Sequence, residues 1–398
     1  MLSVWFVAIA ISSLHLSTLE LAWPGMYWAL VFISLASFAL GVLFIEYVVI
    51  PTANRWKNRS GEGSLARHAL GMTGAPRLRY VIYFLFIVSL GALYLFYKKA
   101  GNFPLLANDP DAFRFQADNQ VPGLINYAAQ LARVFIPLSF FLMFWQGFNW
   151  KKHWDLVVGC TIGTIFIILF ASRTQIFFID LWVMGLYLLM RRPNWKQAVK
   201  FYPAFLLVSI LVLAAVPLYR QYRSYGADYL GTITGIDTSH TNPLEKALIP
   251  IYVGVAFNQQ ALLHAENYYQ AHELQHGKVS LDPFTNIFGK LIKPLNKLKS
   301  NYDLGAIFYS WWNTGTYLFP FVQDFGTSAF YFIPFIIAAI LALVWKYWQT
   351  NPNFLSTNLY AYAMFFIVMT VYLSFTVRAE MYLDLALLVV ISLFINKR

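Results

Sequence analysis

Residues 22–45 read AWPGMYWALVFISLASFALGVLFI, and this stretch contains no charged side chain. An α-helix rises about 1.5 Å per residue, so a run of about 20 apolar residues crosses the hydrocarbon core of a bilayer. The stretch therefore predicts a transmembrane helix. The whole chain agrees, because 59% of its 398 residues are hydrophobic and 12% are charged. Soluble domains have about 45–50% and about 25%, so the composition excludes an ordinary soluble protein.

Apolar runs of similar length recur along the chain and predict an all-α membrane protein with about ten transmembrane helices. The expected spans lie near 1–20, 22–46, 80–97, 121–148, 155–172, 174–190, 201–220, 325–346, 354–376 and 381–396. The first run has no basic start and no small-residue cleavage site, so we expect a retained span rather than a signal peptide. The single cysteine, Cys160, excludes an internal disulfide.

The predicted organisation has three parts. Residues 1–221 carry spans one to seven, residues 222–324 form one long extracytoplasmic loop with short interfacial helices, and residues 325–398 carry spans eight to ten. Within the loop, Ala247–Phe257 and Ile307–Phe319 are apolar pieces too short to span comfortably. Phe284–Leu298 mixes three lysines with Phe, Ile and Leu, which predicts a basic amphipathic stretch on the membrane surface.

The distribution of Lys and Arg predicts the orientation of the chain. Fifteen basic residues fall in one set of loops and at the carboxyl end, and five fall in the opposite short loops. Ten spans with both termini in the cytoplasm satisfy this bias. The net charge of +11 is mostly accounted for by these loops and by interfacial lysines, so no nucleic-acid partner is expected.

Arginines within or beside the spans are the strongest candidates for function, because charge at membrane depth is costly. Most fall at the predicted outer interface, where guanidinium groups suit a phosphate or diphosphate ligand. The alternative is snorkelling to lipid headgroups; for the deep Arg133 it is an ion pair with Asp180 or Asp384. The candidates are Arg114, Arg133, Arg173, Arg220, Arg223 and Arg378.

Two short motifs suggest metal chemistry. Asp109-Pro110-Asp111 fits a two-carboxylate metal pattern, but the same residues are ordinary in turns. His272-Glu273-Leu274-Gln275-His276 has the spacing of a zinc-binding helix with a glutamate base. Gly277 follows at once, and no third ligand stands at an obvious spacing, so a solvated loop helix without metal is favoured.

Several segments resemble the bacterial oligosaccharide repeat-unit polymerases, the O-antigen (Wzy-type) polymerase family. They are the outer-loop residues Gly101–Leu106 followed by Arg114, the Ser172-Arg173-Thr174 turn, and the stretch Trp312–Tyr317 followed by Asp324-Phe325-Gly326. The last piece is the most characteristic. With the ten spans and the long outer loop, the resemblance covers most of the chain.

The resemblance implies a glycosyltransferase that needs no metal or other cofactor. Such an enzyme transfers a growing glycan from undecaprenyl diphosphate to a hydroxyl of a new lipid-linked repeat unit, at the outer face of the bacterial cytoplasmic membrane. Arginines would stabilise the diphosphate leaving group, and a general base would accept the hydroxyl proton. A flippase and a chain-length regulator are the implied protein partners, beside the lipid-linked oligosaccharides and membrane lipid.

We assign residues to these roles as hypotheses. The diphosphate is assigned to Arg173, Arg220 and Arg223, with Arg114, Arg133 and Arg378 as further substrate-binding candidates. The base candidates are Asp237, His240 and Asp324. Asn313, Trp312 and Tyr317 are candidates for sugar contact, although an aromatic belt explains the rings equally well, and Asp324 also suits a helix N-cap.

Three other functions remain open from the sequence. A glycan ligase has closely related chemistry. A transporter or flippase of a lipid-linked anion would use the same arginines for binding, but it predicts internal repeats that the sequence lacks. A membrane zinc metallopeptidase would be built on His272, Glu273 and His276.

Overall fold

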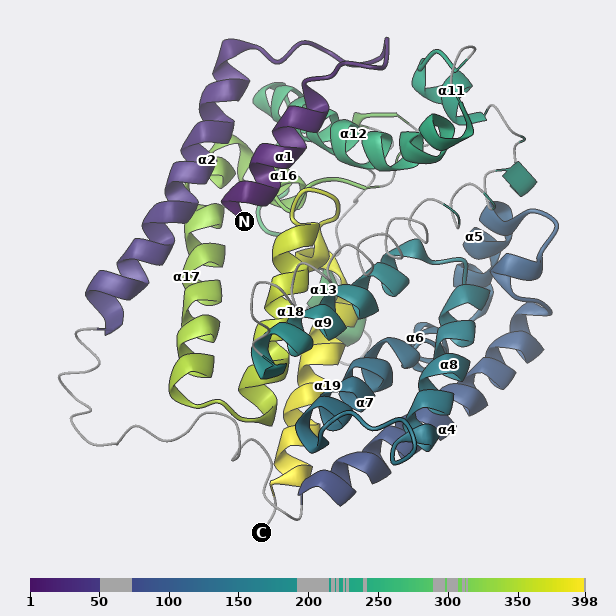
Figure 1. Ribbon diagram of the computed structural model, residues 1–398. Helices are drawn as coiled ribbons and strands as arrows, with labels where there is room; N and C mark the ends of the chain where they lie inside the picture. Colours follow the sequence, from purple (N-terminus) through teal and green to yellow (C-terminus); the bar gives the residue numbers. More distant parts are fainter. Residues whose placement is uncertain are drawn as a thin grey trace. The chain divides into compact units, whose positions relative to one another are not determined.

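The computed structural model describes residues 1–50, 74–191, 215, 219, 222–224, 226, 229–238, 242–288, 298, 307–309, 312 and 314–396. Within these residues the chain is helical and contains no β-strand (Figure 1). It divides into two compact units, which are described separately. Unit 1 comprises Met1–Leu65, Tyr252–Pro352 and Phe366–Ala386, and unit 2 comprises Ala66–Ile251, Asn353–Phe365 and Leu387–Arg398.

Unit 1 is built around two long apolar helices that lie side by side, α2 (Gly25–Phe44) and α17 (Ala329–Thr350). The contact is close because Gly41 has no side chain: a Cβ there would lie 2.9 Å from the Cβ of Ala338. Tyr27 on α2 also meets Phe330 on α17 edge to face, with ring centroids 6.3 Å apart. Small residues at a helix crossing let two backbones approach in this way.

The remaining described elements of unit 1 are short, apart from α12. They are α1 (Leu2–Ser12), the π-helical turn η1 (Ile45–Val49), α13 (Asp282–Phe288), α16 (Phe319–Phe325), and the 3₁₀ turns η3 (Gly326–Ser328) and η4 (Phe375–Val377). From Tyr252 onward, α12 (Pro243–Ala271) belongs to unit 1, and α19 (Ala379–Ile395) does so up to Ala386.

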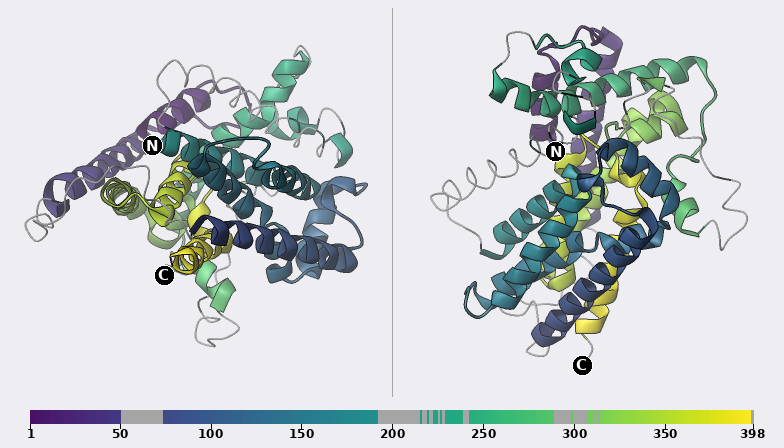
Figure 2. Two further views of the ribbon diagram at one scale, coloured as in Figure 1. Left: turned by 60° about the horizontal axis from the view of Figure 1, so that its bottom comes forward. Right: turned by 90° about the vertical axis from the view of Figure 1, so that its right-hand side faces the viewer.

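Unit 2 is a bundle in which α4 (Gly74–Ala100) packs on α6 (Gly123–Ala129) and α7 (Ala132–Gln146). Helix α7 in turn packs on α8 (Trp154–Leu169) and α9 (Arg173–Arg191), and both views of Figure 2 show the dark-blue α4 beside these blue-teal helices. The unit also contains η2 (Pro104–Leu106), α5 (Pro110–Gln120), α11 (Tyr229–Thr234) and most of α18 (Phe354–Met369).

Five helical segments among the described residues are long and apolar enough to cross a membrane. They are Gly25–Val49, Gly74–Ala100, Gly123–Gln146, Thr174–Arg191 and Phe319–Thr350. Shorter apolar helices occupy Leu2–Ser12, Trp154–Leu169 and Phe354–Met369. Each lies where a span was predicted. The predicted span near 201–220 falls outside the described residues except at 215 and 219, so the count of ten stays a prediction.

The first predicted span is shorter than expected. Helix α1 ends at Ser12, although a helix to residue 20 was predicted. His15 follows with a positive φ of 45°, which breaks the helical path. At about 1.5 Å per residue, the 11 residues of α1 measure about 16 Å, roughly half the thickness of a bilayer core.

The segment predicted as a loop contains the longest helix of the chain's described part, the 29-residue α12. Its buried face includes Val253, Ala256, Phe257, Ala261 and Leu262, each at most 2% exposed. The apolar piece Ala247–Phe257 is therefore part of a packed helix rather than a short interfacial one. Residues 289–297, which carry the lysines of the predicted basic amphipathic stretch, lie outside the described residues. Its first residues belong to α13, and the amphipathic character of the whole stretch stays a prediction.

Candidate functional site

Two segments that carry predicted site residues are joined in unit 2. The hydroxyl of Tyr219 donates to the carbonyl of Leu105 (3.5 Å), and the hydroxyl of Ser224 donates to Oδ1 of Asp109 (2.6 Å). Ser224 also accepts a hydrogen bond from the backbone N–H of Asp111 (3.3 Å). The loop at 101–114 and the segment at 219–224 are thus in contact, and we call this place the arginine corner because it carries Arg114 and Arg223.

Asp109 is the residue that organises the arginine corner. It is the N-cap of α5, where its Oδ1 accepts hydrogen bonds from the backbone N–H groups of Asp111 and Ala112, both at 3.1 Å. The hydrogen bond from Ser224, followed by that from Ala112, lowers the pKa of Asp109 below its ordinary value. Asp109-Pro110-Asp111 is therefore a helix start with Pro at the first position, not a metal pattern.

The two arginines of the corner differ in exposure. Arg114 lies on α5 and is half-buried, whereas Arg223 is exposed and its guanidinium carbon lies 5.9 Å from the ring centroid of Tyr219. Tyr222 beside it is 65% exposed. Arg223 is thus exposed beside aromatic rings that are also exposed, a combination that suits an anion carrying a sugar.

Helix α8 ends at Leu169 and α9 begins at Arg173, so the short connection predicted between these two helices consists of Phe170–Ser172. Arg173 and Thr174, which were predicted to lie in this turn, instead form the start of α9. The turn is made possible by Ala171, whose φ of 50° is left-handed. Arg133 on α7 is 5% exposed, and its guanidinium carbon lies 4.8 Å from the ring centroid of Tyr127. This burial agrees with the prediction that Arg133 lies deep within its span.

Three predicted site residues, Arg220, His240 and Asn313, lie outside the described residues. Asp237 is described: it follows α11 in unit 2 and is exposed. Arg220 is three residues before Arg223 in the sequence, so it is a neighbour of the arginine corner along the chain.

Asp324 has a structural task that the sequence did not reveal. It lies in the last turn of α16 and is 1% exposed. Its Oδ1 accepts the backbone N–H of Val279 (3.1 Å), and its Oδ2 accepts the backbone N–H of Ser280 (2.7 Å) and the Ser280 hydroxyl. Asp324 lies within α16 and the N-cap of α17 is Ser328, so the N-cap prediction for Asp324 is wrong. These donors engage both oxygens of a buried carboxylate, so this Asp324 clamp holds the loop before α13 onto α16, and the role of Asp324 as a general base stays a prediction.

The same clamp is reinforced by the backbone. The N–H of Gln275 donates to the carbonyl of Gln323 (2.9 Å), and the N–H of His276 donates to the carbonyl of Asp324 (3.2 Å). His276 and Gly277 both have positive φ, at 52° and 88°. Helix α12 has already ended at Ala271, so the H-E-x-x-H residues are not on a helix and the zinc geometry is absent. No group of three or more metal-ligating side chains occurs among the described residues.

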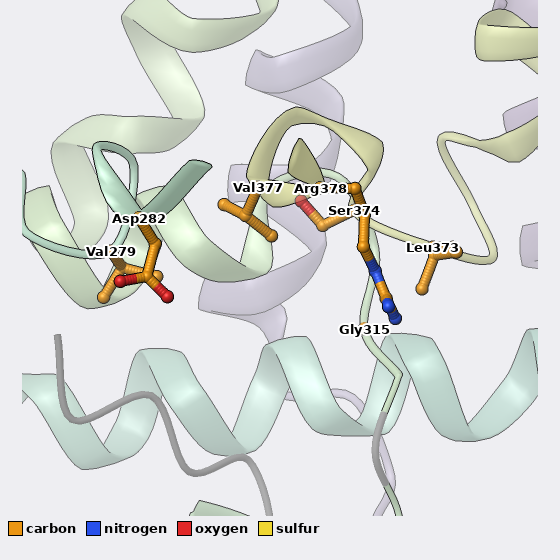
Figure 3. A pocket seen from close by; sticks show the side chains of 7 residues that line it. All are labelled: Val279, Asp282, Gly315, Leu373, Ser374, Val377 and Arg378. Atoms are coloured by element: carbon orange, nitrogen blue, oxygen red, sulfur yellow. The ribbon is translucent and has the colours of Figure 1, made fainter. Parts of the chain in front are cut away.

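A pocket of about 210 Å³ lies in unit 1 beside this clamp (Figure 3). Figure 3 shows the side chain of Arg378 reaching toward Gly315, with Asp282 on the other side of Val377. Arg378 is exposed and makes no ion pair with any described residue. The lining residues are Val279, Asp282, Gly315, Leu373, Ser374, Val377 and Arg378.

The aromatic residues predicted for sugar contact are buried in unit 1. Tyr317 is 0% exposed and packs edge to face on Trp5, with ring centroids 5.8 Å apart. Trp312 is 9% exposed and donates its Nε1–H to Oδ1 of Asn258 (3.3 Å). Neither ring has an open face for a sugar, so the stacking role is corrected to core packing; the contribution of this stretch to the pocket is Gly315.

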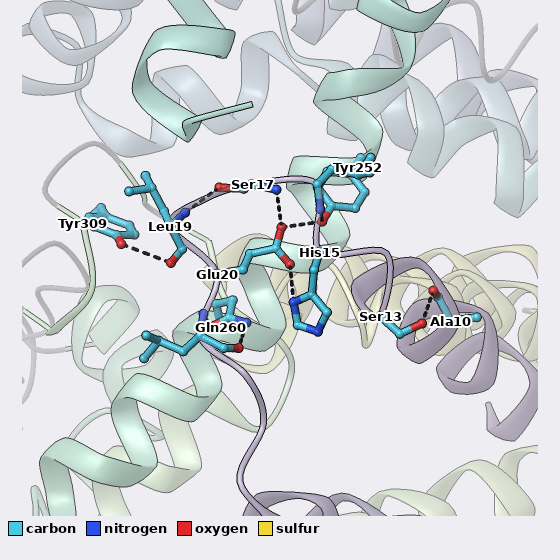
Figure 4. A network of polar contacts seen from close by, with 11 residues as sticks. Ala10, Ser13, His15, Ser17, Leu19, Glu20, Tyr252, Gln260 and Tyr309 are labelled. Carbon is cyan, nitrogen blue, oxygen red and sulfur yellow. Dashed lines mark hydrogen bonds and ion pairs between the residues drawn. The ribbon is translucent and has the colours of Figure 1, made fainter. Parts of the chain in front are cut away.

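Sequence reasoning missed a buried polar network in unit 1 (Figure 4). The carboxylate of Glu20 is 1% exposed; it accepts the Ser17 backbone N–H (3.1 Å) and the Tyr252 hydroxyl, and it lies 3.8 Å from Nδ1 of His15. Tyr252 also accepts the backbone N–H of Leu16 (2.9 Å), and burial raises its pKa. A lone acid within a long apolar stretch is the sequence signal that points to such a network.

The chain was compared with models of protein families, with curated proteins and with solved structures, and nothing matches in any of the three.

Proposed function

We propose that the chain polymerises lipid-linked oligosaccharide repeat units into a surface polysaccharide at the outer face of the bacterial cytoplasmic membrane. The observation that carries the proposal is the arginine corner. The loop at 101–114 and the segment at 219–224 were each singled out independently in the sequence, and they contact each other through Ser224–Asp109 and Tyr219–Leu105.

Diphosphate is the ligand chemistry that best fits this corner. Arg114 and Arg223 supply guanidinium groups, and Arg220 is close to them along the chain. Planar guanidinium groups bind phosphate oxygens through paired charge-assisted hydrogen bonds and keep their charge at any physiological pH. The apolar helices of unit 2 supply the surroundings that a polyprenyl tail requires.

The proposed reaction is a glycosyl transfer. The bond from the anomeric carbon to the diphosphate oxygen breaks, and the acceptor hydroxyl oxygen forms a new bond to that carbon. The leaving polyprenyl diphosphate keeps the electron pair and its developing charge is stabilised by arginines, while a base takes the hydroxyl proton. Asp237 is the preferred base, because it is exposed and in unit 2, whereas the carboxylate of Asp324 is engaged in unit 1.

The test is glycan length in a polymerase-deletion strain that supplies the matching repeat unit. Wild-type protein is expected to restore a ladder of long chains. Arg114→Ala and Arg223→Ala are expected to reduce chains longer than one repeat at least about tenfold, since each removes stabilisation of the leaving group. Gel separation of lipid-released glycan measures the ladder, and immunoblotting checks that each variant is present in the membrane.

Arg191→Ala is the matched control, because Arg191 is an exposed arginine at the far end of α9. It is expected to leave the ladder unchanged. If Arg114→Ala and Arg223→Ala also build the full ladder, the corner arginines only anchor the chain in lipid and the site assignment fails. If wild-type protein forms no ladder in its own host strain, the polymerase proposal fails as a whole.

A further inference from the structure

The turn between α7 and α8 (residues 147–153), together with Trp154 at the start of α8, exposes three large aromatic side chains. Phe148 is 50% exposed, and Trp150 and Trp154 are each 63% exposed. The turn begins one residue after the apolar segment Gly123–Gln146, which is long enough to cross a membrane. A turn at the end of a span lies at the depth of the lipid headgroups, where the amphipathic indole ring is favoured over water or hydrocarbon.

Two lysines lie between these rings and have no acidic partner in the part of the chain that the structure describes. Lys151 and Lys152 are exposed and make no ion pair with any described residue. The acidic residue that follows them, Asp155, is engaged elsewhere: its Oδ2 lies 3.7 Å from Nε of Arg79 and accepts the Tyr83 hydroxyl. The turn therefore carries unneutralised positive charge on a surface flanked by aromatic rings.

The turn is held in shape before any ligand arrives. Oδ1 of Asn149 accepts the backbone N–H groups of Lys151 (3.0 Å) and Lys152 (3.3 Å), which is an Asx turn. The next residue, His153, is 0% exposed, and its Nδ1 lies 3.2 Å from Nη2 of Arg79. A guanidinium only donates hydrogen bonds, so Nδ1 of His153 accepts this one and the imidazole ring is neutral. The hydrogen bond fixes the turn to α4.

From these observations we propose that the α7–α8 turn binds the phosphate of an anionic phospholipid headgroup, with Lys151 and Lys152 on the phosphate and the flanking rings at the interface. The occupant is a lipid because the exposed rings follow directly on an apolar span, and it is anionic because the two lysines have no acidic partner among the described residues. Preorganisation by Asn149 and His153 lowers the entropy lost on binding. This surface lies outside the arginine corner, and the inference does not depend on the proposed function.

The test uses the full-length protein in lipid nanodiscs that contain a photoactivatable phosphatidylglycerol, with crosslinked peptides mapped by mass spectrometry. Crosslinks to the peptide that covers residues 147–154 are expected with wild-type protein. Lys151→Gln/Lys152→Gln is expected to reduce them at least about fivefold, because each lysine near an anionic surface contributes about that factor. Photoactivatable phosphatidylcholine is expected to crosslink several-fold less.

Lys98→Gln/Lys99→Gln is the matched control, since it removes an exposed lysine pair from the other end of α4. It is expected to leave crosslinks at 147–154 unchanged. Equal crosslinking by the two lipids, or an unchanged yield in Lys151→Gln/Lys152→Gln, overturns the proposal. Both lysines are exposed, so the variant is expected to fold; Lys152→Gln alone provides a second, milder variant with a smaller expected loss.

Discussion

At the scale of the residue, a carboxylate in a membrane protein can serve the fold as well as chemistry. Asp324 was a candidate general base in the sequence, yet its two oxygens accept three hydrogen bonds from Val279 and Ser280. Those donors lie 44 and 45 residues earlier in the chain, so no local sequence pattern predicts these hydrogen bonds. Burial and partners, rather than residue type, decide between the two roles.

Asp324→Ala is expected to lower the free energy of unfolding by about 3 kcal/mol, because two buried N–H groups lose a charged acceptor. Ser280→Ala removes one of the three hydrogen bonds and is expected to cost about 1 kcal/mol. Titration of detergent-solubilised protein with a denaturing detergent measures both. A variant Asp324→Ala that unfolds like wild type, but no longer polymerises glycan, restores the catalytic interpretation.

His153 is expected to make stability depend on pH. Burial, and then the nearby positive charge of Arg79, lower its pKa below the ordinary value of 6.5. As the pH falls below 6.5 the unfolded chain takes up the proton first, so the stabilisation is complete above that value and declines as the pH falls toward the lowered pKa.

Thermal unfolding of the solubilised protein at pH 7.5 and about pH 5.5 measures this dependence. The His153→Gln variant, which has no titrating ring, is expected to show a smaller fall in unfolding temperature between the two conditions. An identical fall in wild type and His153→Gln contradicts the prediction and assigns the pH dependence to other groups.

At the scale of the element, the contact between α2 and α17 depends on Gly41. A Cβ at this position would collide with the backbone oxygen of Phe335 and would lie 2.9 Å from the Cβ of Ala338, so the helices would have to separate. Gly41→Ala is therefore expected to destabilise the protein by about 1–3 kcal/mol, as measured by denaturant titration. Gly91→Ala in α4 is the control, because a Cβ there meets nothing within 4 Å.

The control is expected to be neutral or stabilising, since alanine is the better helix former by about 1 kcal/mol. If Gly41→Ala proves as stable as Gly91→Ala, then α2 and α17 adjust without cost and the crossing is looser than its geometry indicates.

The elements that the sequence predicts well are those that meet lipid-like surroundings along their length. Helices α2, α4 and α17 have long apolar centres without charge, and each lies on a predicted span, although α4 begins six residues before the predicted start at 80. Helix α12 was missed because Asn258, Gln259 and Gln260 interrupt its apolar pattern. These three side chains are at most 1% exposed, and packing against protein accommodates polar groups that a hydropathy pattern assigns to a loop.

The candidate site was predictable only in part. Arg114 and Arg223 were found because charge is rare in this chain, whereas Asp282 and Ser374 of the pocket are common residue types without a distinctive spacing. The repetition of Asp-Pro at 109–110 and 282–283 is the one local signal, since each pair begins a helix, α5 and α13. The remaining residues of the pocket and the arginine corner are brought together by tertiary contacts, which a single sequence does not show.

At the scale of the whole molecule, the two ends of α4 are expected on opposite sides of the membrane. The helix has 27 residues and is therefore about 40 Å long. Lys99 lies at its end, while Lys151 lies in the turn that His153 pins to Arg79 near its start. The positive-inside distribution assigns Lys99 to the outer face and Lys151 to the cytoplasm.

Cysteine labelling tests this orientation. Cys160 is the only cysteine, so Cys160→Ser gives a background for Lys99→Cys and Lys151→Cys. A membrane-impermeant maleimide added to intact cells is expected to label the first variant and not the second. The reverse pattern inverts the orientation, and labelling of both shows that α4 does not cross the membrane.

The clamp made by Asp324 has a consequence for how this protein can change. The hydrogen bonds between Ser280 and Asp324 close a loop in which the two residues are 44 positions apart in the chain. The entropy of closing a loop grows only with the logarithm of its length, so doubling the length of such a loop costs about 0.6 kcal/mol. Insertions between Ser280 and Asp324 that keep the core residues Trp312 and Tyr317 in place are thus expected to cost little free energy of folding.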